Sequence, residues 1–507
     1  MSAPIHSHRP GLKILITKRK KSTLVGGRGG SSNSTQSFDL THALGDKGSC
    51  IVTKNLYAYH GEFHIILPDM PFDFGGTGGV QETVDSPYGL IEPMDVVEIR
   101  MDRDVKPDMP IVMRGLVRSV GRDETVGEDG RPMRRVSIVG HDFGCIFTIS
   151  QLWLRVGLRE GNIIDPVYGP LGKVGLISEP VEVEEFIQKL LDYGNESVES
   201  TGISVKPKFE DVKGWVVPTA LPSIEGPLWI TMIRFSDSPW NELFVQDPPT
   251  GDSPELVFRQ TPWKDTDGEF IWFKGSDEPE EEEEELVIGG VRQIKARNSV
   301  AVKVFDVEMA DVLSISSHRN DSGVANFIWV DMPPSFISAH WQQLLSPHAQ
   351  KIAKEAEKDP NSTKNIYGDR LLTQNSFIGP NLAPKDQAEK DQEKSEDDWS
   401  KWRKDRIDWL HKASEDNADF EQGAITVKGD PKYQVGNYLN LKRGVPWEGY
   451  IVGITHEYRA YREYLTTIEF IRGTGFIERV ESNNPWNLER KIKNPWTVIW
   501  GEGVKTS

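Results

Sequence analysis

Three polar residues at alternating positions form the first candidate for a chemical site. His60, Glu62 and His64 are two residues apart, so a β-strand would place their side chains on one face. Imidazole and carboxylate groups bind zinc, and such a strand could supply part of a zinc site. No further ligand stands at a fixed spacing from them, and the polar face of a half-buried strand gives the same pattern. We therefore expect no metal site.

His141, Asp142 and Cys145 are the second candidate, because a thiol beside an imidazole could act as a nucleophile. We expect these residues to be hydrogen-bonding groups at the end of a strand. The glycine-rich segment at 75–79 does not lie between a strand and a helix, so we do not expect it to bind phosphate. The Gly-x-Ser-x-Gly, His-Glu-x-x-His and P-loop patterns are also missing from the sequence. We predict no catalytic residue, no cofactor and no enzymatic activity.

The composition sets limits on the class of protein. With 507 residues the chain is too long for one hydrophobic core, and we expect three or four domains. It has no apolar run of about 18 residues, so we expect no membrane insertion. The net charge of −18 argues against non-specific binding of nucleic acid, although an acidic channel wall would let DNA pass without sticking. The two cysteines, Cys50 and Cys145, are typical of folding in a reducing cytoplasm, and we expect both as buried free thiols.

Changes in periodicity and composition divide the chain into segments. Apolar residues alternate from Phe38 onwards, for example at Val97, Ile99 and Met101, which predicts half-buried strands. The predicted fold class is mainly β with α insertions. The segments are a flexible basic N-terminal arm (1–37), a first tube-like β-barrel domain (38–150), a mixed α/β middle domain that ends in the acidic run at 280–285 (151–285), a second tube-like β-barrel domain (286–335 with 421–476), a charged helical insertion (336–420) and a C-terminal tail (477–507).

A three-strand pattern occurs twice, about 340 residues apart. The first copy reads VVEIRMDR at 96–103, IVMRGLVRSVGRDE at 111–124 and RRVSIVGHDFG at 134–144. The second reads GNYLNLKRG at 436–444, WEGYIVGITHEY at 447–458 and YLTTIEFIRGTG at 464–475. In each copy the second strand opens around a Gly and the third ends in a Gly. The repeat predicts two related β-domains that present similar faces to one partner, which favours an assembly protein over an enzyme with one pocket.

The second copy resembles the last conserved block of tail hub proteins of contractile-tailed bacteriophages, a late control protein D-like family. The residues that fit its pattern are Gly429 and Pro431 in a Gly-x-Pro turn, Gly436 at a strand entry, His456 at the histidine, and Arg472 with Gly473 at the end, while Ile454 replaces a Val. Three further blocks agree, and they are DPNSTKNIYGDRLL at 359–372, the middle segment with Asn241 to Phe244 and Leu256 to Pro262, and ADVLSISSHRNDSGVANFIWV at 310–330. The N-terminal arm, the acidic run and the tail depart from the family.

The resemblance implies a homotrimer in which two barrel domains per chain form a ring of six similar units. Such a ring adapts a six-fold tail tube to a three-fold spike and is crossed by DNA as transient cargo. The implied partners are a second and third copy of the chain, the tail tube protein, the central spike protein and other baseplate components. The implied location is the tail baseplate of a virion that is assembled in the cytoplasm of a host bacterium.

Two other functions stay open at this stage. A cell-wall-degrading enzyme would need an added domain with a catalytic pair, and the insertion at 336–420 is highly charged and helical. A receptor-binding or sugar-binding tail component would need exposed aromatic residues, and Trp486, Trp496 and Trp500 in the tail are its support. We predict that these three residues contact an assembly partner. The alternative is that the tail wraps its own barrel.

Overall fold

The structure is a computed structural model, and its described residues cover most of the chain. They are residues 9–18, 37–75, 81–126, 132–152, 154–156, 166–168, 181–199, 202, 204–210, 212–216, 226–250, 253–272, 284–288, 291–295, 301–331, 363–380, 389–442 and 446–475.

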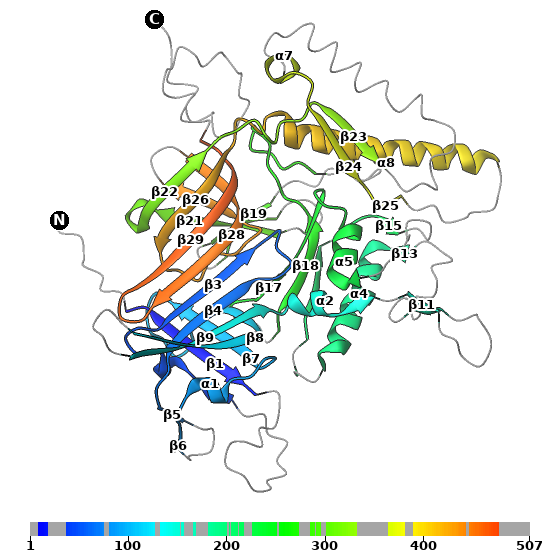
Figure 1. Cartoon of the computed structure of the whole chain (residues 1–507). Helices are drawn as coiled ribbons and strands as arrows, with labels where there is room; N and C mark the ends of the chain where they lie inside the picture. Colours follow the sequence, from blue (N-terminus) through cyan, green and yellow to red (C-terminus); the bar gives the residue numbers. More distant parts are fainter. Residues whose placement is uncertain are drawn as a thin grey trace, which may run out of the picture.

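One sheet of 15 strands dominates the structure (Figure 1). Its strands fall into two sets, which we call the first and the second sheet unit. The first unit is β3-β4-β9-β8-β7-β1-β2 in sheet order, and its strands are β1 (Gly11–Thr17), β2 (Ser37–Asp39), β3 (Ser49–Asn55), β4 (Glu62–Pro68), β7 (Val96–Asp102), β8 (Ile111–Val126) and β9 (Pro132–Asp142). The second unit runs from β19 through β20, β21, β27, β28, β29 and β26 to β22, and its strands are β19 (Glu284–Ile288), β20 (Val291–Lys295), β21 (Ala301–Glu308), β22 (Val312–His318), β26 (Glu421–Lys428), β27 (Tyr438–Lys442), β28 (Pro446–Arg459) and β29 (Glu463–Gly473).

The two units repeat the same strand arrangement, which confirms the predicted pair of related β-domains. In the first unit β3, β4, β9, β8 and β7 pair in that order, and all pairs are antiparallel. In the second unit β22, β26, β29, β28 and β27 pair in the same order, also antiparallel. The units differ at the next strand, because β1 pairs β7 antiparallel whereas β21 pairs β27 parallel. Among the described strands neither set closes on itself into a complete barrel.

Details of the backbone repeat as well. The ladder between β8 and β9 shifts register between Val117 and Ser119, and the ladder between β28 and β29 shifts between Ile451 and Gly453. These positions are equivalent, so both units carry a β-bulge at the same place. Val117 exchanges hydrogen bonds with the residues just before β7, and Ile451 does the same before β27.

The strand β1 corrects the predicted N-terminal arm. Residues 11–17, which we assigned to a flexible arm, pair with β7 along their whole length. Leu12, Ile14 and Ile16 lie in the core of the first unit, and they alternate with the less buried Lys13, Leu15 and Thr17. The alternation is only seven residues long and stands beside a basic and glycine-rich stretch, which hid it in the composition.

The middle segment packs helices against a small sheet. Its helices are α2 (Cys145–Ile149), α4 (Val183–Ser197) and α5 (Leu228–Ser236), and its strands are β10 (Gln151–Leu152), β11 (Leu154–Val156), β12 (Pro166–Tyr168), β13 (Val181–Glu182), β14 (Lys206–Glu210), β15 (Trp215–Val216), β16 (Gly226–Pro227), β17 (Asn241–Gln246) and β18 (Glu255–Gln260). In the sequence, the spacing of Val183, Phe186, Ile187, Leu190 and Leu191 predicts the apolar stripe of a helix. In α4 all five side chains are fully buried. Phe186 meets Phe235 of α5 edge to face, with ring centroids 5.0 Å apart.

The insertion combines a long helix with short strands. Helix α8 (Glu389–Glu415) runs past β23 (Phe327–Asp331) and β24 (Leu371–Asn375), as Figure 1 shows. The remaining short elements are β5 (Phe72–Gly75), β6 (Gln81–Val84), β25 (Ile378–Gly379), α1 (Pro87–Leu90) and α7 (Thr363–Tyr367). The strands β24 and β25 show that the insertion is not purely helical, contrary to our prediction. The spacing of Trp399, Trp402, Trp409 and Leu410 in the sequence predicts a stripe on one helix face that packs on the helix's own chain. Trp409 is buried and stacks on Trp263 with centroids 5.5 Å apart, in agreement with that prediction.

Candidate assembly surface

The two sheet units are joined edge to edge by main-chain pairing. Residues Gly453–Arg459 of β28 pair antiparallel with Ser49–Asn55 of β3, about 400 positions earlier in the chain. The Thr53 and Thr455 hydroxyls lie 3.3 Å apart across this joint, and the Leu56 amide donates to the Val452 carbonyl at 2.7 Å. Val52 and His456, which face each other in the register, are both buried. The joint therefore makes one continuous sheet of two related units.

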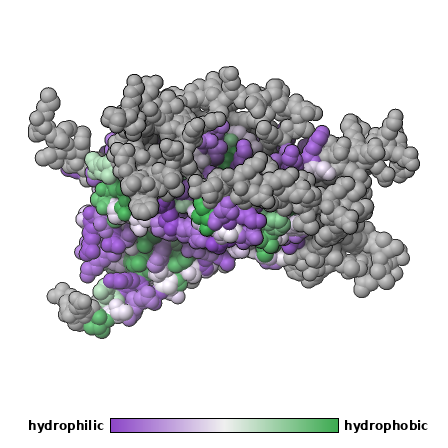
Figure 2. Space-filling model, turned by 90° about the horizontal axis from the view of Figure 1, so that it is seen from above, coloured by the Kyte–Doolittle hydropathy of each residue, from purple (hydrophilic) through white to green (hydrophobic). Residues whose placement is uncertain are grey.

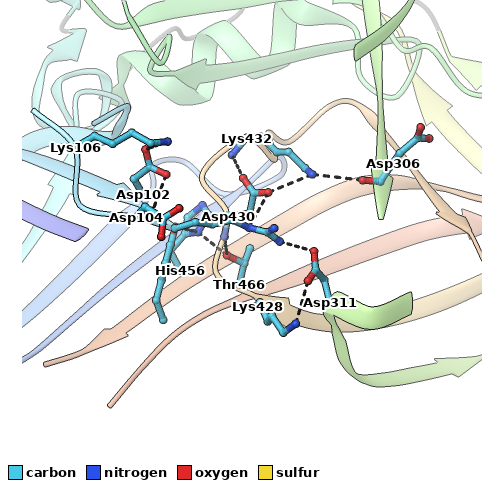
Figure 3. Close-up of polar contacts among 12 residues, drawn as sticks. Asp102, Asp104, Lys106, Asp306, Asp311, Lys428, Asp430, Lys432, His456 and Thr466 are labelled. Carbon is cyan, nitrogen blue, oxygen red and sulfur yellow. Dashed lines mark hydrogen bonds and ion pairs between the residues drawn. The ribbon is translucent and has the colours of Figure 1, made fainter. Parts of the chain in front are cut away.

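A cluster of ion pairs supports the joint (Figure 3). Arg103, which follows β7, lies 2.7 Å from Asp311 and 3.2 Å from Asp430 of the second unit. Lys428 approaches the same Asp311 at 3.2 Å, and Lys432 approaches Asp430 at 3.2 Å. Although burial raises the pKa of Asp311, hydrogen bonds from Arg103 and Lys428 lower it below the ordinary value. The cluster thus fixes the end of β7 against the second unit with charged hydrogen bonds.

His456 lies in a buried hydroxyl pocket within the second unit. Its Nδ1 is 3.0 Å from the Thr466 hydroxyl and 3.1 Å from the Tyr464 hydroxyl. The Thr466 hydroxyl also accepts a hydrogen bond from the Asp430 amide at 3.1 Å. Burial lowers the pKa of His456 to about 3, so the ring is neutral at neutral pH. The histidine of the family pattern therefore holds β28 against β29 and the turn that contains Asp430.

The other residues that carry the resemblance also hold structure. A Cβ on Gly429 would overlap the Tyr464 ring, so only glycine fits there without movement. Gly436 has a φ of 73°, in the left-handed region that favours glycine. Arg472 is buried and donates to the carbonyls of Lys264 at 2.6 Å and of Ala413 at 2.9 Å. The arginine at the end of β29 thus connects the second unit to the middle segment and to α8.

A buried ion pair connects the matched middle block to the same unit. Glu242 of β17 and Arg259 of β18 lie 2.6 Å apart, and the Tyr450 hydroxyl of β28 donates to Glu242 at 2.5 Å. Arg259 also donates to the Gly436 carbonyl. Burial raises the pKa of Glu242, and the Arg259 charge opposes that rise. Four positions from two distant matched blocks therefore meet in one network.

The histidine cluster differs from the predicted one. His60 and Glu62 meet His141 of β9, and the ligand atoms of these three residues lie within 4.8 Å of one another. His64 lies apart from them, with its Nε2 2.8 Å from the Ser137 hydroxyl. The His60 and His141 rings stack, with centroids 3.8 Å apart and planes inclined by 15°. Stacked rings direct their nitrogen lone pairs along nearly parallel planes, so as placed they do not converge on one tetrahedral ion.

Asp142 and Cys145 are buried structural groups. Asp142 accepts a hydrogen bond from the Gly144 amide at 2.9 Å, and burial raises its pKa to about 6. Cys145 is the first residue of α2, and burial raises the pKa of its thiol to about 12. A nucleophilic cysteine needs the thiolate form, which this environment disfavours. Cys50 and Cys145 are both buried free thiols, as predicted.

Several predicted features fall outside the described residues. Trp486, Trp496 and Trp500 lie there, so their role as a partner contact stays a prediction. Of the acidic run, only residues 284 and 285 are described, and they are the first two residues of β19.

On the face seen in Figure 2, hydrophilic residues surround several separate hydrophobic areas. No helix in the described part of the chain is both long and apolar enough to cross a membrane.

Sequence reasoning missed the joint and its ion pairs. The strand β3 shows no local sign that its partner is β28, and Arg103 was noted only as the end of a strand. The repeat was the available signal, because a unit that occurs twice carries both of its edges twice, so the β3 edge of one unit can pair with the β28 edge of the other.

Comparisons with known proteins give structural neighbours only. No protein-family model matches the chain, and no curated protein matches it. The solved 43 kDa tail protein of prophage MuSo2 from Shewanella oneidensis is 11% identical, with 91% of this chain and 98% of that chain covered and a TM-score of 0.42. A tail protein from Neisseria meningitidis is 10% identical, with coverage of 91% and 96% and a TM-score of 0.44. An Escherichia coli component of the type VI secretion system, described as similar in structure to the T4 bacteriophage tail proteins gp27 and gp5, is 7% identical, with coverage of 85% and 74% and a TM-score of 0.35. These structural neighbours are thus a prophage tail protein, a second tail protein and a component of the type VI secretion system.

Proposed function

We propose that the chain is a structural hub protein of a phage tail baseplate. Three copies form a ring of six sheet units, which joins the six-fold tail tube to the three-fold spike. The observation that carries the proposal is the edge-to-edge joint between two related units in one chain. The joint pairs two different edges of the unit, β3 of one and β28 of the other, so it can be repeated from chain to chain. Repeated joints of this kind form a ring when the rotation between neighbours closes.

The residues that carry the resemblance support an assembly role. His456, Arg472, Gly429 and Gly436 hold strands, turns and neighbouring segments together. Asp142 and Cys145, the residues closest to a catalytic pattern, are buried. The proposed protein is therefore not an enzyme and needs no cofactor. Its partners are its own copies, the tail tube protein, the central spike protein and other baseplate components, and its place is the virion tail, after assembly in the host cytoplasm.

The ring would line the channel through which DNA leaves the particle. A net charge of −18 per chain favours an inner wall that does not retain phosphates. A surface-potential map of the assembled ring checks this, and a continuous stripe of Lys and Arg facing the channel would contradict it.

Mass measurement tests the ring itself. Native mass spectrometry of the full chain, alone and with its tube protein, should give three copies per assembly, and cryo-electron microscopy of the tail should show the same number. A stable hexamer, or a single copy in the particle, would disprove the proposal. Purified protein should also leave a peptidoglycan suspension turbid, whereas clearing would indicate a cell-wall-degrading enzyme.

A further inference from the structure

The joint pairs β28 of the second unit with β3 of the first. The strands that correspond to these two, β8 and β22, each have an edge with no partner strand among the described residues. The second half of β28 has β29 on one side and β3 on the other. The equivalent half of β8 has β9 on one side, while β7 reaches only as far as Leu116. Among the described residues no strand pairs with the other side of β8 from Ser119 to Thr125. The side chains of this half are mostly exposed.

The strand β22 is the equivalent of β3, and its outer edge is also open. It pairs with β26 as β3 pairs with β4, and no other described strand pairs with it. Six of its seven residues are exposed, including Leu313 at 57% and Ile315 at 37%. An exposed edge strand with apolar side chains is a template for another strand, and natural proteins usually protect such edges. Figure 1 shows β22 at the outer side of the second unit.

We propose that β22 of one chain adds to the open half of β8 in the next copy, which rests on the proposed ring function. The partner is a second copy of this chain. Within the chain β3 pairs with β28, so its equivalent β22 should pair with the equivalent of β28, which is β8. The contact is heterologous, since β22 and β8 are different surfaces, and a heterologous contact forms a ring when the rotation between neighbouring copies closes, which the proposed function requires after three copies.

The internal joint fixes the register of the proposed contact. The matching β-bulges make Gly453 of β28 equivalent to Ser119 of β8. The ladder between β22 and β26 matches the ladder between β3 and β4, and this makes Ser314 equivalent to Ser49. Gly453 pairs with Asn55 in the joint, and the equivalent of Asn55 is Asn320. The predicted antiparallel pairs are Ser119 with Asn320, Gly121 with His318, Asp123 with Ser316 and Thr125 with Ser314.

The same template shows which amides face the partner. The Leu56 amide donates to Val452, so alternate residues of β3 before it, including Val52, direct their main-chain groups toward β28. The equivalent of Val52 in β22 is Ser317. Its amide should therefore face the neighbouring chain, whereas the Ser316 amide faces β26 in the same chain.

Cysteine cross-linking tests the register. We would mix chains carrying Asp123→Cys with chains carrying Ser316→Cys, because the two residues form a non-hydrogen-bonded pair whose side chains approach closely. Each mixed ring of three has one interface that carries both cysteines, so mild oxidation should link up to about half of the chains in an equal mixture into covalent dimers, while each variant alone should stay unlinked. Cys50 and Cys145 are buried, so they do not compete. The matched control replaces Ser316→Cys with Ser314→Cys, which is displaced by two residues and should link far less.

A proline tests the edge without the need for cross-linking. Ser317→Pro removes the amide that faces the partner and leaves the ladder to β26 intact, so it should reduce the trimer fraction by about tenfold or more. Ser317→Thr keeps the amide and should assemble normally. Circular dichroism melting should show that both variants fold. The cross-linking experiment does not use the proline variant. It therefore still decides the question if Ser317→Pro fails to fold.

The outcomes separate this inference from the proposed ring. Suppose that mass measurement gives three copies, but Asp123→Cys and Ser316→Cys chains do not link, or the Ser314→Cys control links equally well. Either result would overturn the strand pairing and leave the ring standing. Trimers that survive Ser317→Pro would overturn it as well. Single copies under all conditions, with and without the tube protein, would overturn both.

Discussion

A neutral histidine in the core shows how a single residue can link pH to the stability of the joint. His456 has no acidic partner at its Nδ1, which faces the Thr466 and Tyr464 hydroxyls. Its strand also forms the joint with β3, so a charge on His456 would be placed beside buried Val52.

We predict that acid destabilises the chain through His456. Its pKa falls from 6.5 to about 3 on folding, so between these values the unfolded chain binds a proton that the folded chain does not. The free energy of unfolding is complete above pH 6.5 and decreases as pH falls toward 3. Between about pH 7 and about pH 5 the loss should be about 2 kcal/mol.

Denaturant unfolding at several pH values measures this loss. His456→Asn should lower the stability at neutral pH and remove most of the difference between neutral and mildly acidic solution. His64→Asn, in the first unit, should retain that difference. If His456→Asn and the unchanged chain lose stability equally on acidification, another group is responsible.

At the scale of elements, close approach decides which residues the turns and joints accept. The turn before β27 brings Gly429 against the Tyr464 ring of β29, and its amide donates to the Tyr464 carbonyl at 2.8 Å. The β17-β18 hairpin meets β28 through a buried ion pair. The first contact holds a turn of the second unit against β29, and the second holds the middle segment against that unit.

Gly429→Ala should destabilise the second unit. The added methyl group would overlap the Tyr464 ring, and overpacking of this kind costs about 1–3 kcal/mol. Gly89→Ala is the control, because a Cβ at Gly89 has no atom within 4 Å. Thermal melting of both variants measures the effect, and equal melting temperatures would refute the packing argument.

Arg259→Met should cost about 3–5 kcal/mol, because it leaves the Glu242 carboxylate buried without its partner. The double variant with Glu242→Gln should recover a large part of this loss, since the neutral amide still accepts from Tyr450. Urea unfolding of the single and double variants checks the coupling, and strictly additive losses would mean that the two charges do not depend on each other.

At the scale of the whole molecule, the acidic chain combines one continuous sheet with a tail that carries three tryptophans. The joint between β3 and β28 uses one edge of each unit, and the tail begins directly after β29. The two uses proposed for the tail are a contact to a partner and a cover for its own barrel.

Deletion of residues 480–507 distinguishes these uses. If Trp486, Trp496 and Trp500 contact a partner, the shortened chain should melt as the full chain does but fail to attach the spike or a neighbouring hub subunit. Burying such a side chain at an interface contributes about 2 kcal/mol or more. Aggregation, or loss of the melting transition, would show that the tail belongs to the chain's own core.

The sequence by itself determined the local elements and the repeat. Alternation at Val97, Ile99 and Met101 set which face of β7 is buried, and the stripe of α4 did the same for its helix. These patterns are readable because a side chain's direction depends on the period of its own element. The glycine and histidine spacing of the second copy likewise marked the turn, the strand entry and the buried ring.

Only the tertiary structure decided which distant segments meet. Met94 and Gly436 precede β7 and β27 with φ of 75° and 73°, an equivalence that their residue types conceal. His141 rather than His64 joins His60 and Glu62, because β4 and β9 pair in a register that no local pattern specifies. The pairing of β3 with β28 arises in the same way, since strand partners are chosen by packing and main-chain hydrogen bonds between residues hundreds of positions apart.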